Sequence, residues 1–323
     1  MKITVILCTY NRCQNLEEAL HSVAASILPD SVEWEVLVID NNSHDQTRDV
    51  VEDFCRRYPG RFRYLFEGQQ GKSYALNSAI REARGDILAF MDDDVTVEPT
   101  WLQNLTAKLQ NGEWIGAGGR ILPDWPCAPP SWLPQKEWYG MAPLVMFDFG
   151  LEAGPLRDAP FGTNMAFHRS MFEKYGTFRT DLGPRPDSEI RSEDTEFGSR
   201  LLAAGERIRY EPAAVVYHAV PQKRLQKKFF LKWWFDRGRA DIRENGGATD
   251  ARCLVFGVPL LLLRKLAVGT LRWMVTLGPP RRFSRRLTAW FLAGRTVEFY
   301  RRSQQMNHNV KNSGVPECVV RTK

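Results

Sequence analysis

The sequence predicts an α/β fold in which helices flank a mostly parallel central sheet, followed by a helical C-terminal extension. Two observations predict it. Short β-branched runs alternate with helical patterns in the first 120 residues, and helical patterns rich in Lys and Arg fill residues 221–323. Strand-helix alternation implies parallel strands whose crossover helices cover both faces of the sheet. We expect strands at 2–9, 35–40, 61–66 and 86–91, and helices at 14–26, 45–58 and 72–84.

Residues 121–220 predict the second half of the same fold. "GTNMAFHR" (162–169) and "AAVVYHAV" (213–220) have strand patterns, and "SEDTEFGSRLLAAG" (192–205) has a helix pattern. We expect Ser192 to cap this helix, because a serine side chain can accept a hydrogen bond from a free backbone N–H of the first turn. The sequence therefore divides into three expected segments, 1–120, 121–220 and 221–323.

Charge is unevenly distributed along the 323 residues. Residues 1–220 hold 22 Lys and Arg against 32 Asp and Glu, whereas residues 221–323 hold 22 against 6. An acidic body with a basic tail suggests chemistry in the first part and an anionic partner for the second. The six cysteines form no CxxC pair, which favours reduced thiols over a zinc site or a disulfide scaffold. No signal-peptide pattern opens the chain, so we expect a cytoplasmic protein.

The basic tail is expected to form three helices, at 224–244, about 254–277 and about 282–304. Its longest apolar run, "CLVFGVPLLLL", has eleven residues, which is short of the ~20 needed to span a bilayer. Apolar and aromatic faces mixed with Arg and Lys are typical of helices in a membrane interface. We expect residues 221–304 to bind the anionic inner face of the cell membrane. Nucleic-acid binding by the same cations is the alternative, which the apolar runs disfavour.

Three consecutive aspartates, Asp92, Asp93 and Asp94, follow the apolar strand pattern of residues 86–91. Their charges repel one another, and each is costly to desolvate without compensation. Two explanations are open: a solvated acidic turn, or a divalent cation that uses carboxylate oxygens as ligands. Ligands of parallel sheets bind outside the carboxyl ends of the strands. The polar strand ends "CTYNR", "IDNNS" and "MDDD" therefore predict one shared crevice.

Two nucleotide-binding motifs are excluded. "GKS" at 71–73 lacks the preceding glycine of a P-loop, since Phe66 stands at that position, and no GxGxxG follows the first strand.

Five segments together resemble family 2 glycosyltransferases of the GT-A type, whose fold is Rossmann-like with a mixed, mostly parallel sheet. They are "ILCTYNR", "VLVIDNNSHDQT", "GKSYALNSAIREARGDILAFMDDDV", "GTNMAFHR" and "SEDTEFGSRLLAAGERIRYEPAAVVYH", and they cover roughly residues 1–220. The resemblance implies inverting transfer of a sugar from a uridine-type nucleotide-diphosphate sugar to a hydroxyl of a glycan or lipid-linked acceptor. The QxxRW motif of processive synthases is absent, which favours transfer of a single sugar. A nucleotide-sugar-binding module without catalysis remains an alternative.

The resemblance also implies a donor site. The turn after the first strand and the acid that ends the second would hold the base and ribose, although an ordinary turn role for Asp40 is the alternative. The family often has Arg where Leu76 stands, and Lys72 is a candidate to replace its diphosphate contact. The donor-binding residues expected on this basis are Thr9, Tyr10, Asn11, Arg12, Asp40, Lys72, Asn77, Asp92 and Asp93.

By the same resemblance, Asp94 would bind Mn²⁺ or Mg²⁺, with Asp92 in support and His218 completing the site. Imidazole is a competent ligand, but a structural role for His218 is the alternative. Asp194, next to Glu193, would be the general base that removes the proton of the acceptor hydroxyl. An acid at a helix start also has a simpler explanation in the helix dipole.

Overall fold

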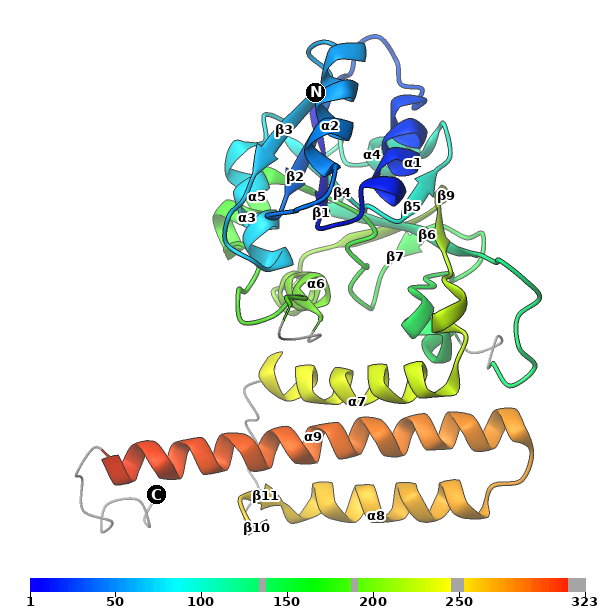
Figure 1. The fold of residues 1–323 in the computed structure, drawn as a ribbon, viewed down its shortest axis with the longest axis vertical. Coiled ribbons are helices and arrows are strands. Elements are labelled where there is room, and N and C mark those ends of the chain that lie inside the picture. Colours follow the sequence, from blue (N-terminus) through cyan, green and yellow to red (C-terminus); the bar gives the residue numbers. More distant parts are fainter. Residues whose placement is uncertain (134–137, 187–190, 245–252, 313–323) are drawn as a thin grey trace. The chain divides into compact units, whose positions relative to one another are not determined.

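A computed structural model describes residues 1–133, 138–186, 191–244 and 253–312. The chain divides into two compact units, Met1–Gln226 and Lys227–Lys323 (Figure 1). The first unit is built on one nine-stranded sheet, in which eight strands follow the order β3-β2-β1-β4-β8-β6-β9-β5 and β7 pairs with β9.

The N-terminal half of this sheet is parallel. Strand β1 lies between β2 and β4, and β3 pairs with the outer side of β2. Ile3, Val5 and Leu7 of β1 are fully buried, as expected for a central strand covered on both faces. The elements of this half are β1 (Lys2–Thr9), α1 (Cys13–Ala24), β2 (Glu33–Asp40), α2 (Thr47–Arg57), β3 (Phe62–Phe66), α3 (Lys72–Glu82) and β4 (Ile87–Asp92).

The remaining strands make the sheet mixed. Strand β8 pairs antiparallel with both β4 and β6, β9 runs parallel to β6, and β5 pairs antiparallel with β9. The elements are β5 (Val95–Val97), α4 (Trp101–Thr106), β6 (Gly116–Asp124), η1 (Trp138–Leu144), β7 (Gly154–Pro155), β8 (Asn164–His168), α5 (Arg169–Tyr175), α6 (Glu193–Ala203), β9 (Ile208–Ala219) and η2 (Gln222–Arg224).

A buried amide fixes the mixed half of the sheet. Asn164 Oδ1 accepts a hydrogen bond from Trp101 Nε1 at 2.8 Å, and its Nδ2 donates to the carbonyl oxygens of Arg120 at 2.9 Å and Ala214 at 2.8 Å. A Cβ atom at Gly119 would collide with the Asn164 side chain. Because a buried amide must find partners for its donors and acceptor, this network fixes β8 against β6 and β9.

The predicted α/β fold with a mostly parallel, mixed sheet is confirmed, and each strand and helix expected in residues 1–220 has a counterpart. Strands β5, β6 and β7 were not expected, and the expected segment boundary at 120/121 falls inside β6. The predicted cap of α6 is wrong. Ser192 has a positive φ of 95° and its side chain makes no capping hydrogen bond. Helix α6 therefore begins without a side-chain cap from Ser192.

The second unit contains three helices within its described residues. Helix α9 contacts both α7 and α8. Gly238 of α7 faces the backbone of Phe291, and Gly294 of α9 faces the backbone of Phe235. These reciprocal glycines let the two helix backbones approach closely. The elements are α7 (Lys227–Glu244), β10 (Leu254–Val255), β11 (Val258–Pro259), α8 (Leu260–Val275) and α9 (Pro279–Asn312).

Ion pairs also hold α7 against α9. Glu298 is buried and accepts hydrogen bonds from Arg243 Nε at 2.7 Å and from Arg239 Nε at 3.1 Å. The helix expected at about 254–277 begins instead with the β10-β11 hairpin, since α8 starts at Leu260. None of the helices in the described ranges is long and apolar enough to cross a bilayer.

Candidate functional site

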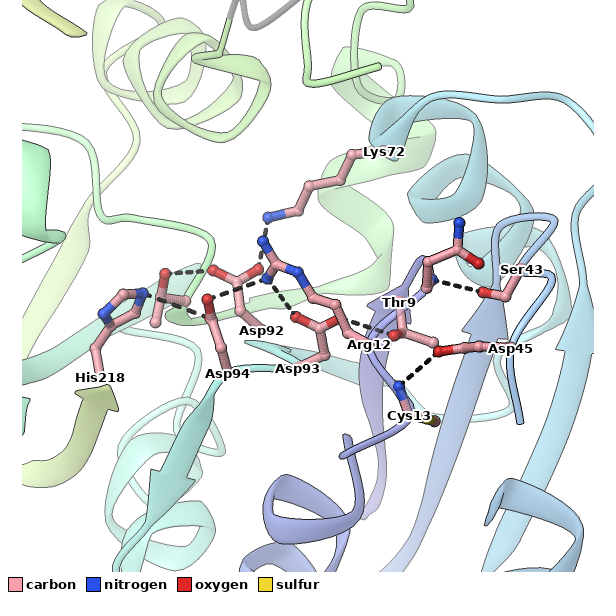
Figure 2. A network of polar contacts seen from close by, with 12 residues as sticks. Thr9, Arg12, Cys13, Ser43, Asp45, Lys72, Asp92, Asp93, Asp94 and His218 are labelled. Carbon is pink, nitrogen blue, oxygen red and sulfur yellow. Dashed lines mark hydrogen bonds and ion pairs between the residues drawn. The ribbon is translucent and has the colours of Figure 1, made fainter. Parts of the chain in front are cut away.

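The carboxyl ends of β1 and β4 open into a pocket of about 330 Å³ that belongs entirely to the first unit. The three aspartates 92–94, called the acid triplet below, span the connection between β4 and β5. They line the pocket together with a set of cationic side chains, of which Arg12 and Lys72 are shown beside the acid triplet in Figure 2. These cations are Arg12, Lys72, Arg185, Arg191 and Arg224.

Asp92 is held by a lysine and a threonine. Lys72 Nζ lies 2.6 Å from Asp92 Oδ1, and Thr163 Oγ1 donates to Asp92 Oδ2 at 2.6 Å. Pairing of Met91 with Asn164 across β4 and β8 places Thr163 opposite Asp92. Burial is the largest influence and would raise the pKa of Asp92, but the Lys72 charge and the hydrogen bonds from Lys72 and Thr163 together outweigh it and hold this pKa well below its usual range.

Asp93 is buried and bonded to the end of β1 and the turn after it. Thr9 Oγ1 donates to Asp93 Oδ2 at 2.7 Å, and Arg12 Nη1 lies 2.9 Å from Asp93 Oδ1. Burial raises the pKa of Asp93 to about 6, although the Arg12 guanidinium opposes the rise. Arg12 Nη1 also contacts Asp94 Oδ2 at 3.1 Å, so one guanidinium serves two members of the acid triplet.

Asp94 faces His218 because of strand pairing. Val95 of β5 is paired with His218 of β9, and Ala219 N donates to Asp94 O at 3.3 Å. The His218 Nε2 atom lies 3.5 Å from Asp94 Oδ1. Burial lowers the pKa of His218, a shift that the Asp94 charge opposes, so the ring favours its neutral, ligating form.

This pair fits a divalent cation only in part. His218 Nδ1 is buried and has no hydrogen-bond partner in the described part of the chain. No hydrogen bond to that nitrogen therefore explains why the His218 ring is buried in this orientation. Carboxylate oxygen and neutral imidazole are both accepted by Mn²⁺. However, no group of three or more His, Cys, Asp or Glu side chains suited to a metal ion occurs within the described ranges. Among the described residues, Asp94 and His218 are therefore the two principal candidate donors.

Asp40 and Asn11 lie in a loop network beside the pocket rather than on its lining. Asp40 is buried, and its two oxygens accept hydrogen bonds from Ser43 N at 2.8 Å and Tyr64 Oη at 2.9 Å. Asn11 has a φ of 51°, and its Oδ1 accepts a bond from His44 N at 2.7 Å. The turn role of Asp40 that the sequence left open is therefore present, whereas Tyr10 lines the pocket.

Asn77 is not among the residues that line the pocket. Its Nδ2 donates to Phe178 O at 2.9 Å, and its Oδ1 accepts from Phe178 N at 3.0 Å. This buried pairing occupies both ends of the amide and ties α3 to the chain after α5. The structure thus gives Asn77 a structural role and does not bring it to the predicted donor site.

The first turn of α6 fixes the orientation of Asp194. Its Oδ2 accepts a bond from Gly162 N at 2.6 Å, and its Oδ1 accepts one from Thr195 N at 2.7 Å. Glu193 is buried 3.7 Å from Lys72 Nζ. Burial, and after it the charge of Asp194, raises the pKa of Glu193 to about 7. Lys72 thus links the acid triplet to the start of α6.

Sequence reasoning missed several residues of this site, among them Thr163, Arg224 and Asn41. Thr163 was hidden in a strand pattern, and Arg224 among the cations of the tail. Asn41 lines the pocket and organises the loop before Lys72, since its Oδ1 accepts from Gly71 N at 2.8 Å and its Nδ2 donates to Gln69 O at 2.8 Å. Thr163 could have been found only by knowing that β8 pairs antiparallel with β4.

The mixed sheet, with acids and cations gathered at the ends of its parallel strands, is that of a glycosyltransferase of the GT-A type. Comparison with known proteins makes this specific. Residues 4–176 match the model of Glycosyl transferase family 2, and the chain belongs to this family.

Curated relatives and solved structures agree with this assignment. A glucosyl-dolichyl phosphate glucuronosyltransferase of Haloferax volcanii is 28% identical over 240 residues, 72% of this chain and 75% of the relative. The succinoglycan biosynthesis protein ExoM of Rhizobium meliloti is 28% identical over 243 residues, 74% of each chain. The fold is similar to that of a mannosyltransferase of Pyrobaculum calidifontis solved with GDP-Man and Mn²⁺, with a TM-score of 0.57, 20% identity, and coverage of 97% of this chain and 76% of that one.

Proposed function

We propose that this glycosyltransferase is inverting and metal-dependent, and that it moves one sugar from a UDP-sugar to a hydroxyl of a glycan or lipid-linked acceptor. The observation that carries the proposal is the pocket in which the acid triplet and His218 lie among five cations. Cations in excess of acids suit a diphosphate, and Arg and Lys are the side chains that bind phosphate oxygens. The name of the Haloferax relative, which acts on a dolichyl phosphate sugar, supports a lipid-linked acceptor.

Asp94 and His218 are the residues proposed to hold Mn²⁺ or Mg²⁺, with Asp92 in a supporting position. Lys72 and Thr163 bond to both oxygens of Asp92, whereas Asp94 Oδ1 faces His218 Nε2, so Asp94 is the principal carboxylate. When bound, the cation would neutralise negative charge on the departing diphosphate. Arg12 and Lys72 supply positive charge from the chain itself at the same pocket.

Asp194 is proposed to be the general base. As the acceptor oxygen bonds to the anomeric carbon, the bond from that carbon to the diphosphate oxygen breaks, and the hydroxyl proton passes to Asp194. Attack opposite the leaving group inverts the anomeric centre. Support comes from the two backbone N–H groups, of Gly162 and Thr195, that hold the carboxylate in one orientation, since a base must be positioned before it can act.

Asp194→Asn tests this assignment. The amide keeps the shape of the side chain but cannot take the proton, so transfer should fall by about 10²-fold or more while UDP-sugar binding persists. Glu196→Gln is the matched control, because Glu196 lies in the same helical turn and pairs with Arg200 at 2.9 Å. Retention of full activity by Asp194→Asn would exclude Asp194 as the base. Transfer that persists unchanged in EDTA would exclude the metal.

We further propose that residues 221–304 attach the enzyme to the anionic inner face of the cell membrane. Helix α8 supports this, because only Leu262 among its residues is buried. Four exposed apolar side chains at helical spacing form one face of α8, here called the α8 face. They are Leu261, Val268, Leu271 and Val275, with exposed fractions of 63, 48, 61 and 67%.

Charge around the α8 face suits anionic lipid. Residues 253–305 contain ten Lys and Arg but one acid, Glu298, which is already buried against Arg239 and Arg243. Arg264, Lys265 and Arg272 are exposed on α8 itself, and an exposed apolar stripe on a cationic helix is the pattern of a helix lying in the headgroup region.

Vesicle sedimentation tests the membrane proposal. Vesicles that contain phosphatidylglycerol should capture the full chain, whereas neutral phosphatidylcholine vesicles should capture little. The double variant Leu261→Gln/Leu271→Gln should lose about tenfold or more in affinity. The control Ile27→Gln removes an equally exposed apolar side chain of the first unit and should bind as wild type does. Stronger capture by duplex DNA than by anionic vesicles at equal salt would favour the nucleic-acid alternative.

A further inference from the structure

Arg224 contacts both residues of the proposed metal pair. Its Nη1 lies 3.3 Å from His218 Nε2, and its Nη2 lies 3.7 Å from Asp94 Oδ2. The residue is 8% exposed, so its charge is poorly screened by water. Near this one guanidinium lie the same imidazole nitrogen and carboxylate that a divalent cation would use.

A short turn brings Arg224 back over His218. Strand β9 carries His218 and ends at Ala219, and Val220 N then donates to Asp124 O at 3.1 Å. The single turn η2 follows, closed by a bond from Arg224 N to Pro221 O at 2.7 Å. Arg224 therefore stands at the end of a three-residue turn rather than within the sheet that fixes His218.

A divalent cation and this guanidinium compete for one place. A metal ion on Asp94 and His218 Nε2 would meet the like charge of Arg224 at short range, which is strongly unfavourable in a buried site. Arg12 also contacts Asp94, but its stronger bond to Asp93 at 2.9 Å can hold it when Asp94 changes partner. Arg224 contacts both proposed donors, His218 Nε2 and Asp94, so it is the cation that a metal ion on this pair would displace.

We propose that Arg224 is the counter-ion of Asp94 and His218 while no metal ion is bound. When a metal ion displaces it, the Arg224 guanidinium moves to the diphosphate, so divalent-cation binding depends on the presence of a diphosphate. The inference rests on the proposed function, because it takes the metal pair and the diphosphate donor from there. Its consequence is ordered loading, in which the cation alone binds weakly and the cation together with a nucleoside diphosphate binds well.

Titration with Mn²⁺ alone, followed by the electron paramagnetic resonance signal of the free ion, tests this without any transfer reaction. Arg224→Met should bind Mn²⁺ about tenfold more tightly than wild type, because a competing like charge has been removed. Added UDP should tighten Mn²⁺ binding in wild type by a larger factor than in Arg224→Met. Arg224→Lys keeps the charge and should resemble wild type with Mn²⁺ alone.

Arg120→Met is the matched control, because it removes a partly buried arginine that pairs with Asp148 outside the pocket. It should leave both titrations unchanged. Mn²⁺ affinity of folded Arg224→Met that is equal to or weaker than wild type, or undetectable, would overturn the proposal. If Arg224→Met does not fold, equal Mn²⁺ affinity of wild type with and without UDP would overturn it instead. Failure of the proposed function is distinguished by a different result, namely that Asp194→Asn has no effect on transfer.

Discussion

The pair between Lys72 and Asp92 should be strongly coupled in folding. The Nζ and Oδ1 atoms are 2.6 Å apart, and the two side chains are only 26 and 22% exposed. At an effective dielectric constant of about 20, two unit charges at this distance attract by about 6 kcal/mol. Desolvation opposes part of that, and Thr163 shares the carboxylate. We therefore expect Lys72→Met to cost about 3 kcal/mol of unfolding free energy, the usual result of leaving a buried charge without its partner.

A double-mutant cycle measures this coupling. Lys72→Met, Asp92→Asn and the double variant are unfolded in urea at pH 7, and the double variant should be about 2 kcal/mol more stable than the sum of the single effects predicts. The coupling depends on ionised Asp92. Because the pKa of Asp92 is lowered in the folded protein, this stabilisation is present above the ordinary aspartate pKa and is lost as the pH falls toward the folded value.

The control cycle uses Lys2 and Glu33, which are 3.7 Å apart with side chains 38 and 78% exposed. An exposed pair of this kind contributes about 0–1 kcal/mol, so Lys2→Met and Glu33→Gln should be nearly additive. A Lys72–Asp92 coupling no larger than this control would refute the view that Lys72 neutralises the acid triplet from within the fold.

Three further predictions concern other parts of the molecule. Because burial raises the pKa of Glu193 to about 7, wild type should lose stability as the pH rises from about 4.5 through 7. The melting temperature of Glu193→Gln should therefore rise relative to that of wild type between pH 5 and pH 8. Melting temperatures of the two proteins that change in parallel with pH would contradict this. Asn77→Ala should cost about 1–3 kcal/mol by leaving the buried Phe178 backbone groups unpaired, with unchanged UDP-sugar affinity in calorimetry; a selective loss of affinity would instead restore Asn77 to the donor site. Gly238→Ala should destabilise the second unit by about 2 kcal/mol or more, because a Cβ atom would collide with the Phe291 backbone; an unchanged melting transition of that unit would disprove the close helix crossing.

The place of the site could be predicted from the sequence, because it depends on local patterns. An apolar run followed by 92–94 indicates a buried strand with acids at its end, and strand-helix alternation makes neighbouring strands parallel. Their carboxyl ends then share one edge of the sheet. The structure brings Thr9, Arg12 and the acid triplet to one pocket, whereas Asn11 and Asp40, which were expected in the same crevice, do not line it.

Partners that depend on distant pairing could not be predicted. Thr163 and Asp92 are 71 positions apart, and they meet because β8 runs antiparallel to β4 where the parallel half of the sheet ends. Arg224 depends on the turn after β9. Asn77 carried a family pattern but satisfies backbone groups of Phe178, and sequence alone does not distinguish an amide that binds a ligand from one that closes a buried turn.

Lys72, Arg12 and Arg224 neutralise the charge of the acid triplet, and this affects whether the protein needs a metal ion in order to fold in the cell. Many metal proteins fold only as their ions arrive, because their ligand side chains cannot be buried without the ion. Here each of the three aspartates already has a cation from the same chain. Under the proposed metal dependence, newly synthesised chains would therefore fold and persist without the ion, and a change in ion supply would alter the fraction of active molecules rather than the number of folded ones.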